Sequence, residues 1–173
     1  MEEVKLKGSP IKLDGKFVHI GEMAPDFEMV KKDLSTYSLK DSKGKYVVLN
    51  IFPSLDTSVC AQSVRKFNEI AVSMPNSVVL AISKDLPFAQ ERFCSTEGID
   101  NLIALSDFRN ISDFGKRYGV LIEDSPLKGL FARAVIILDT EGRIIYTELA
   151  PEITHEPNYE KAIKALKEME NLG

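Results

Sequence analysis

Two cysteines, Cys60 and Cys94, are the residues of this sequence best suited to do chemistry. Cys60 lies in the first turn of a predicted helix that begins after Thr57, and this helix directly follows an apolar strand. Unpaired backbone N–H groups and the positive end of the helix dipole lie in a first turn, and both favour an anion. The position of Cys60 therefore favours a thiolate, which is the reactive form of cysteine.

A thiolate in this position needs more stabilisation than a helix provides. An ordinary thiol, with a pKa of about 8.5, is only about 3% ionised at pH 7. A fall to a pKa of about 6 requires about 3.4 kcal/mol of preferential stabilisation of the anion. A helix terminus supplies about 0.3–1 kcal/mol, and about 2 kcal/mol in favourable sites. We therefore expect a cation or a strong hydrogen-bond donor near the thiol.

Arg133 is the candidate for that cation, because it opens an apolar segment that is predicted to be a buried strand. A buried charge needs a partner. The partner is either a thiolate with its oxidant or one of the many carboxylates of the chain, and the position of Arg133 alone does not decide between them. Arg65 and Arg109 are further possible donors.

Each of these residues also has a structural interpretation. Intracellular cysteines are commonly small buried apolar residues. Cys94, beside Phe93 near the end of a predicted helix, has the pattern of a core residue. Thr57 taken alone is an ordinary helix N-cap.

Strands and helices alternate through the part of the chain that must position these side chains, and this order predicts a mixed sheet with helices on both faces. Gly and Pro residues mark most element ends, and the continuous apolar run after Lys45 is typical of a strand buried on both faces. The predicted strands are Val4–Lys7, Ile11–Leu13, Phe17–Ile20 after an Asp14-Gly15 turn, Tyr46–Phe52, Val78–Ile82, Leu102–Leu105, Ala134–Leu138 and Arg143–Leu149. The predicted helices are 58–73, Pro87–Thr96, Ile111–Tyr118 and Tyr159–Met169.

Composition narrows the class of protein. The chain has 173 residues, of which 44% are hydrophobic, so we expect one domain spanning 1–173. A net charge of −4 without a basic block gives no reason to expect nucleic acid or membrane as a partner. No apolar run is long enough to span a bilayer and the N-terminus lacks a signal-peptide core, so we expect a cytoplasmic protein. His19 and His155 lack the short spacing of zinc ligands, so we expect no metal and no cofactor.

The segment Pro53-Ser54-Leu55-Asp56-Thr57-Ser58-Val59-Cys60 resembles the peroxiredoxin active-site motif, with Ser58 where many members have Pro. The chain more narrowly resembles the bacterial thiol peroxidase subfamily, in order and over nearly its whole length. The matching segments are Arg92-Phe93-Cys94 before Glu97-Gly98, Leu105-Ser106-Asp107-Phe108-Arg109-Asn110, Tyr118-Gly119-Val120, Pro126-Leu127-Lys128-Gly129-Leu130, Ala132-Arg133-Ala134-Val135 and Glu152-Ile153-Thr154.

This resemblance implies a thioredoxin-like fold with an N-terminal β-hairpin extension. It implies that Cys60 is the peroxidatic cysteine that attacks a hydroperoxide and that Cys94 is the resolving cysteine that forms an intrachain disulfide with it. Thr57 would then hydrogen-bond the thiolate and the peroxide, and Arg133 would stabilise the thiolate and the transition state. Pro53 would shield the pocket from water and shape the turn. The resemblance also implies a homodimer that is recycled by thioredoxin.

Two other readings of the cysteines compete with this one. A thioredoxin-type oxidoreductase needs a Cys-x-x-Cys pair, but Ala61, Gln62 and Ser63 follow Cys60. A non-enzymatic redox-sensing module could use the same Cys60–Cys94 switch without turnover. Since a disulfide requires Cα atoms within about 7 Å, we also expect the first turn at Cys60, the end of the Cys94 helix, or both to rearrange when the disulfide forms.

Overall fold

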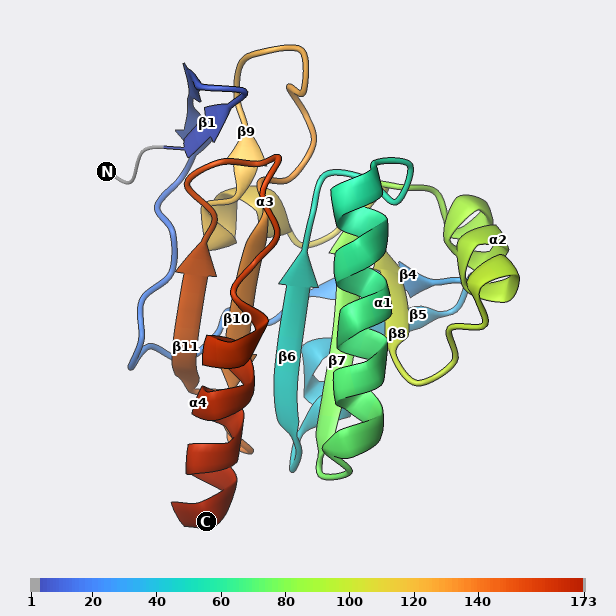
Figure 1. Ribbon diagram of the computed structural model, residues 1–173, viewed down its shortest axis with the longest axis vertical. Helices are drawn as coiled ribbons and strands as arrows, with labels where there is room; N and C mark the ends of the chain where they lie inside the picture. The colour runs from blue at the N-terminus through green and yellow to red at the C-terminus, as the bar shows by residue number, and fades with distance from the viewer. Residues whose placement is uncertain (1–3, 173) are drawn as a thin grey trace.

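A computed structural model describes residues 4–172 of the chain, and Figure 1 shows how its elements are arranged. The helices are the 3-10 turn η1 (Leu39–Ser42), α1 (Ser58–Ser73), α2 (Pro87–Glu97), α3 (Phe114–Tyr118) and α4 (Tyr159–Leu172). The strands are β1 (Val4–Leu6), β2 (Ser9–Ile11), β3 (Leu13–Asp14), β4 (Glu28–Lys31), β5 (Thr36–Ser38), β6 (Tyr46–Ile51), β7 (Ser77–Ser83), β8 (Ile103–Ser106), β9 (Leu121–Ile122), β10 (Ala134–Leu138) and β11 (Ile144–Leu149). No helix in the described range 4–172 is long and apolar enough to cross a membrane.

One mixed sheet organises the fold, with strand order β11-β10-β6-β7-β8-β4-β5. Strands β6, β7 and β8 run parallel, with α1 and α2 as the connections between them, whereas β10, β11, β4 and β5 join antiparallel to their neighbours. Every residue of β6 is buried, as the apolar run predicts for a central strand. The predicted mixed sheet is therefore confirmed.

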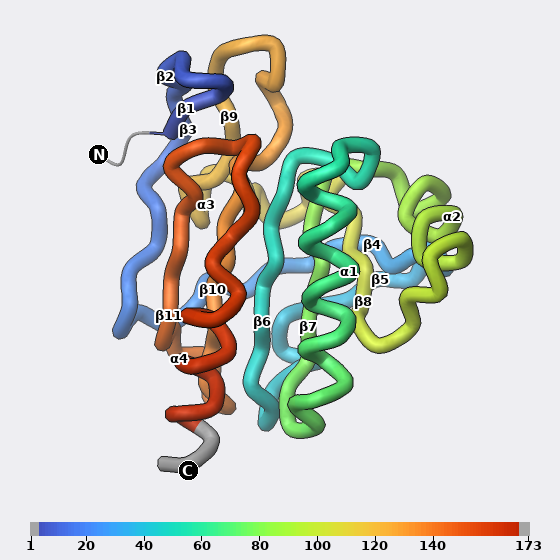
Figure 2. The backbone as a smooth tube through the Cα atoms, viewed as in Figure 1, coloured from blue at the N-terminus to red at the C-terminus, as the bar shows by residue number. Residues whose placement is uncertain are grey.

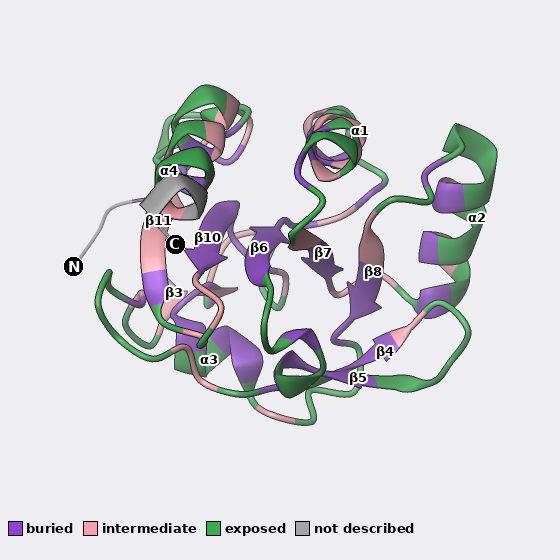
Figure 3. Ribbon diagram, turned by 90° about the horizontal axis from the view of Figure 1, so that it is seen from below, coloured by how far each residue is buried: buried purple, intermediate pink, exposed green. Residues whose placement is uncertain are grey.

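Helices cover both faces of this sheet, and Figure 3 shows α1, α2 and α4 on one side and α3 on the other. Successive side chains of the central strands point to opposite faces of the sheet. Val48 of β6 and Val135 of β10 pack on one side with Phe67 of α1. Leu49 of β6 packs on the other side with Phe114 of α3. Because the parallel strands β6, β7 and β8 end at the same edge, the loops that follow them lie together, and this is where sites on α/β sheets gather.

An N-terminal β-hairpin is present as predicted, and β1 pairs with β2 through Val4↔Ile11 and Leu6↔Ser9. Its turn lies at Lys7 and Gly8, which both have positive φ angles, of 50° and 83°. Figure 2 shows that the hairpin lies beyond one end of β10 and β11 and that the chain then runs down beside β11. Hydrogen bonds from Gly21 N to Ile144 O and from Ile144 N to Glu22 O fix that run to the sheet edge.

Several features of the fold differ from the prediction. The predicted strand Ile11–Leu13 is divided between β2 and β3, and the turn η1 was not predicted. Phe17–Ile20 is not a strand. The chain turns at Gly15, which has a positive φ of 82° and lies so close to α3 that a side chain there would collide with the Lys116 carbonyl. The predicted helix Ile111–Tyr118 begins only at Phe114, since Asp113 just before it adopts a left-handed backbone with φ 54°. Strands β4, β5 and β9 were not predicted, because they are only two to four residues long and are defined by their pairing, β4 with β8, β5 with β4 and β9 with β3.

Candidate active site

The segment between β6 and α1 leads into the helix that contains Cys60. Thr57 is the N-cap of α1, as its position predicts, and the helix has the predicted limits. Cys60 is the third residue of α1 and is fully buried, at 0% exposure. Pro53, which is also buried, directly follows Phe52, the first residue past the end of β6. The thiol therefore lies where the positive end of the helix dipole favours an anion, out of contact with bulk water.

Arg133 donates from Nη2 to the Sγ atom of Cys60 at 3.2 Å. The guanidinium is buried, with 1% of the residue exposed, and its Nε donates to the carbonyl oxygen of Ile153 at 2.9 Å. Its third nitrogen, Nη1, is buried and has no hydrogen-bond partner among the described residues. Of the two partners considered for Arg133, the structure therefore brings the thiol to it, and one donor stays available beside the sulfur.

The two other arginines considered as donors are occupied elsewhere. Arg65 pairs with Glu97, and Arg109 lies with its guanidinium carbon 5.2 Å from the centre of the Phe108 ring.

Thr57 lies at the predicted position, but its side chain forms no hydrogen bond to the Cys60 thiol in this structure. Its exposed hydroxyl donates instead to the carbonyl oxygen of Ser54 at 2.9 Å. The backbone N–H of Thr57 donates to the same oxygen at 3.2 Å, which closes the turn before α1. The hydroxyl can donate to an incoming ligand only by giving up its bond to Ser54.

Asp85, a residue that the sequence reasoning missed, anchors this turn. Its carboxylate accepts hydrogen bonds from the Ser54 hydroxyl at 2.7 Å and from the Leu55 backbone N–H at 2.8 Å. It also accepts from the Ser83 hydroxyl at 2.7 Å. The signal available in the sequence was an acidic residue two positions after the end of β7, at the edge of the sheet where sites gather.

Cys94 lies in α2, and only 4% of it is exposed. Burial raises the pKa of the Cys94 thiol above its ordinary value, although nearby Lys32 opposes the shift. Both cysteines are free thiols, yet they belong to one apolar cluster between α1, α2 and the sheet. The buried members of this cluster are Phe52, Leu55, Cys60, Val64, Ala81, Cys94, Ile99 and Ala104.

An ion pair joins the two helices that carry the cysteines. Arg65 of α1 donates from Nη2 to Glu97 Oε1 at 2.8 Å and from Nε to Glu97 Oε2 at 3.1 Å. Glu97 is the last residue of α2, one turn beyond Cys94. Next to it, a hollow of about 190 Å³ separates α2 from the turn before Cys60 and includes Leu55 and Phe93 in its lining. This bidentate pair therefore holds the Cys94 end of α2 in place.

A mixed sheet with helices on both faces is the architecture of a thioredoxin-like protein, and a thiol in the first turn of a helix beside a buried guanidinium is in the setting typical of a reactive cysteine. The family model described as Redoxin matches residues 19–163, and the chain belongs to that family. It is 53% identical over 167 residues to a thiol peroxidase of Leptospira interrogans, covering 95% of this chain and 97% of the relative. A thiol peroxidase of Corynebacterium glutamicum is 49% identical over 166 residues, covering 96% and 99%.

A solved structure of a further similar protein has the same fold. A crystal structure of a peroxiredoxin-like protein from Aquifex aeolicus superposes with a TM-score of 0.92 at 45% identity, covering 98% of each chain. Within its family the chain is thus a peroxiredoxin enzyme of the thiol peroxidase subfamily, and the predicted thioredoxin-like fold is confirmed.

Proposed function

We propose that the enzyme reduces hydrogen peroxide and organic hydroperoxides with Cys60 as the peroxidatic thiolate. The contact between Arg133 Nη2 and Cys60 Sγ at 3.2 Å is the observation that carries this proposal. The thiolate attacks the terminal peroxide oxygen, the O–O bond breaks, and the leaving oxygen takes a proton to become water or an alcohol. The sulfur is oxidised by two electrons to a sulfenic acid while the peroxide is reduced.

Arg133, Thr57 and Pro53 prepare the site for this step. Negative charge spreads over the sulfur and both oxygens in the transition state, and donors fixed in advance stabilise it with little reorganisation. In this proposal the unpartnered Nη1 of Arg133 donates to a peroxide oxygen while Nη2 stays on the sulfur. The Thr57 hydroxyl turns from Ser54 to the bound peroxide, and buried Pro53 keeps water from the thiolate.

Cys94 then condenses with the sulfenic acid, forming the Cys60–Cys94 disulfide and releasing water. Thioredoxin reopens this disulfide by thiol–disulfide exchange. Both thiols are buried on separate helices in the reduced state, and burial holds Cys94 in its protonated form. The end of α2, the first turn of α1, or both therefore rearrange before the sulfurs join.

We also propose that the enzyme is a cytoplasmic homodimer, because its sequence resembles the thiol peroxidase subfamily. Exposed apolar side chains support self-association, because Leu86 and Phe88 at the start of α2, and Phe108 and Ile111 in the loop after β8, are 40–67% exposed. Exposed apolar side chains that lie together are typical of protein interfaces.

The Cys94→Ser variant tests the two-cysteine cycle. We expect it to be oxidised at Cys60 by the first equivalent of hydrogen peroxide, seen as a gain of oxygen by intact mass, because Arg133 and α1 are untouched. Thioredoxin-supported turnover should be strongly impaired, since no disulfide forms. Many equivalents of peroxide consumed by the wild type with thioredoxin would separate an enzyme from a redox-sensing module. Equal residual activity of Cys94→Ser and Cys60→Ser would contradict the assignment.

The ion pair between Arg65 and Glu97 gives a test of the rearrangement. Replacing Glu97 by Gln removes the bidentate link between the helices, so we expect the disulfide to form about two- to fivefold faster after Cys60 is oxidised, on the scale of an exposed ion pair. Rapid-quench mass spectrometry of the disulfide measures this rate. Glu69→Gln is the matched control, because Glu69 pairs with Lys66 within α1 alone. An equal rate for Glu97→Gln and the control would show that α2 does not have to leave α1.

A further inference from the structure

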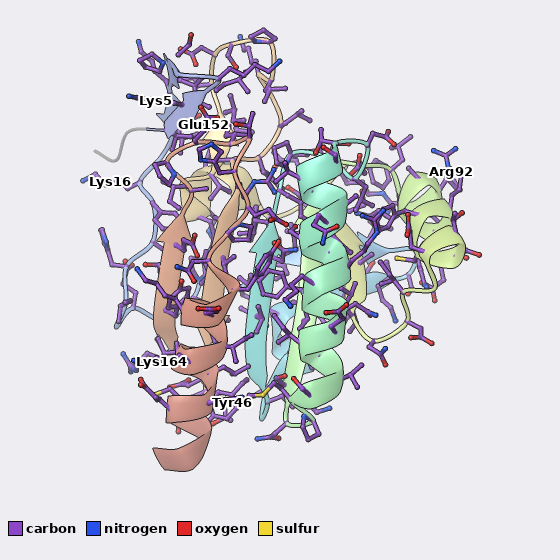
Figure 4. The ribbon with its side chains drawn as sticks, in the orientation of Figure 1. Lys5, Lys16, Tyr46, Arg92, Glu152 and Lys164 are labelled. Atoms are coloured by element: carbon purple, nitrogen blue, oxygen red, sulfur yellow. The ribbon has the colours of Figure 1, made fainter. Side chains whose placement is uncertain are left out.

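We propose that Glu152 is a positioning residue for the peroxide reaction, which acts through the Ile153 carbonyl to fix the guanidinium of Arg133 against Cys60. The N-terminal hairpin is then part of the active-site framework. This inference rests on the proposed roles of Cys60 and Arg133. Figure 4 shows Glu152 beside β1 and Lys5, at the end of the molecule where the hairpin lies.

The carboxylate of Glu152 ties the hairpin turn to the loop before α4. Its Oε1 accepts from the Gly8 backbone N–H at 2.8 Å, and its Oε2 accepts from that of Lys7 at 3.1 Å. Oε2 also accepts from the backbone N–H of Thr154 at 3.1 Å and from its hydroxyl at 2.9 Å. The backbone N–H groups of Thr154 and Gly8 lower the pKa of Glu152 to about 2, so the carboxylate is ionised throughout the neutral range.

Backbone pairing holds the same loop against β1. Lys5 N donates to Pro151 O at 2.8 Å, and Ile153 N donates to Lys5 O at 2.9 Å. The Ile153 side chain is 4% exposed and packs with Val4 and Ile11 of the hairpin. Ile153 is therefore fixed to the hairpin by its N–H and its side chain. The Glu152 carboxylate ties the next residue, Thr154, to the hairpin turn as well.

The remaining polar group of Ile153, its carbonyl oxygen, faces the active site. It accepts the hydrogen bond from Arg133 Nε at 2.9 Å, and the main chain of Arg133 is held as well, because Ala150 N donates to Arg133 O at 2.9 Å. A guanidinium is planar and rigid, so a bond at Nε sets the directions of both terminal nitrogens. The position of the Ile153 carbonyl therefore decides where Nη2 and the unpartnered Nη1 point relative to Cys60.

A purely structural role for Glu152 is the alternative, and the chain offers a matched control. Asp124 also accepts a backbone hydrogen bond from the N-terminal segment, with Lys12 N at 2.8 Å. The loop that carries Asp124 has no hydrogen bond to the Arg133 side chain among the described residues. Loss of the Asp124 contact should loosen the N-terminal segment without moving the guanidinium.

The experiment compares Glu152→Gln with Asp124→Asn. Gln keeps the size of the side chain but loses one acceptor and the charge. We expect Glu152→Gln to slow the second-order reaction of Cys60 with hydrogen peroxide by about tenfold, because small displacements of a positioned group cost up to about 100-fold. Asp124→Asn should react at the wild-type rate, and thermal unfolding checks that both variants are folded.

A double-mutant cycle decides whether Glu152 acts through Arg133. In the Arg133→Ala background, Glu152→Gln should cause no further slowing, because the group it positions is gone. An equal further slowing in that background, or a wild-type rate for Glu152→Gln alone, would overturn the proposal while leaving the peroxidase mechanism intact. A wild-type rate for Arg133→Ala alone would instead remove Arg133 from the mechanism, and Glu152 with it.

Discussion

Replacing Cys60 by Ser is expected to abolish peroxide consumption, with no turnover above the uncatalysed background. A serine hydroxyl at this position is nearly isosteric with the thiol, but it does not ionise near neutral pH and does not form the sulfenic acid on which the cycle depends. The site around it should persist, because Arg133 is also held by Ile153. Stopped-flow measurement of peroxide loss checks the result.

Two controls make the loss in Cys60→Ser specific. Circular dichroism and thermal unfolding should match the wild type, because the substitution changes one buried atom. Cys94→Ser should still reduce the first equivalent of peroxide. Sustained peroxide reduction by Cys60→Ser would place the nucleophile elsewhere in the chain.

Replacing Arg133 by Ala is expected to lower the rate constant for the first oxidation by about 100- to 1000-fold, the usual cost of removing a preorganised donor from a developing anion. The variant loses the donor to Cys60 Sγ and the unpartnered Nη1. Competition kinetics with hydrogen peroxide measure this rate constant.

Because Arg133 is buried, Arg133→Ala also leaves a cavity and an unpaired Ile153 carbonyl, so a second variant is needed. Arg133→Lys keeps the positive charge, but an ammonium lacks the planar fork that reaches Ile153 and Cys60 together. We expect an intermediate rate for Arg133→Lys. A wild-type rate in either variant would contradict the role given to Arg133.

Local signals in the sequence were sufficient to predict the elements that carry the site. The apolar run of β6, Pro53 after it and the N-cap Thr57 all act within a few residues, so the start of α1 and the place of Cys60 followed directly. A buried arginine at the mouth of β10 predicted a need for a partner. The position of Arg133 alone left the choice between the thiol and a carboxylate open, because the partner is far away in the chain. The family resemblance indicated the thiol, and the structure has Arg133 Nη2 at 3.2 Å from Cys60 Sγ.

Contacts between distant segments account for what the sequence did not reveal. Asp85 holds the turn before Cys60 from the end of another strand, and Glu152 holds a hairpin turn near the other end of the chain. Neither residue stands in a local pattern that marks its partner. The Thr57 hydroxyl, by contrast, forms a local hydrogen bond to the Ser54 carbonyl oxygen. This bond competes with the hydrogen bond to the thiolate and the peroxide that the family resemblance implies.

The intact mass of the reduced protein after one equivalent of hydrogen peroxide, followed by peptide mapping, tests the central claim most directly. The account predicts the loss of two hydrogens and a peptide in which Cys60 and Cys94 are linked. Oxygen added at Cys60 without a disulfide would keep the peroxidatic role but leave Cys94 as a core residue. An unchanged mass after minutes of exposure would contradict the peroxidase mechanism proposed for Cys60.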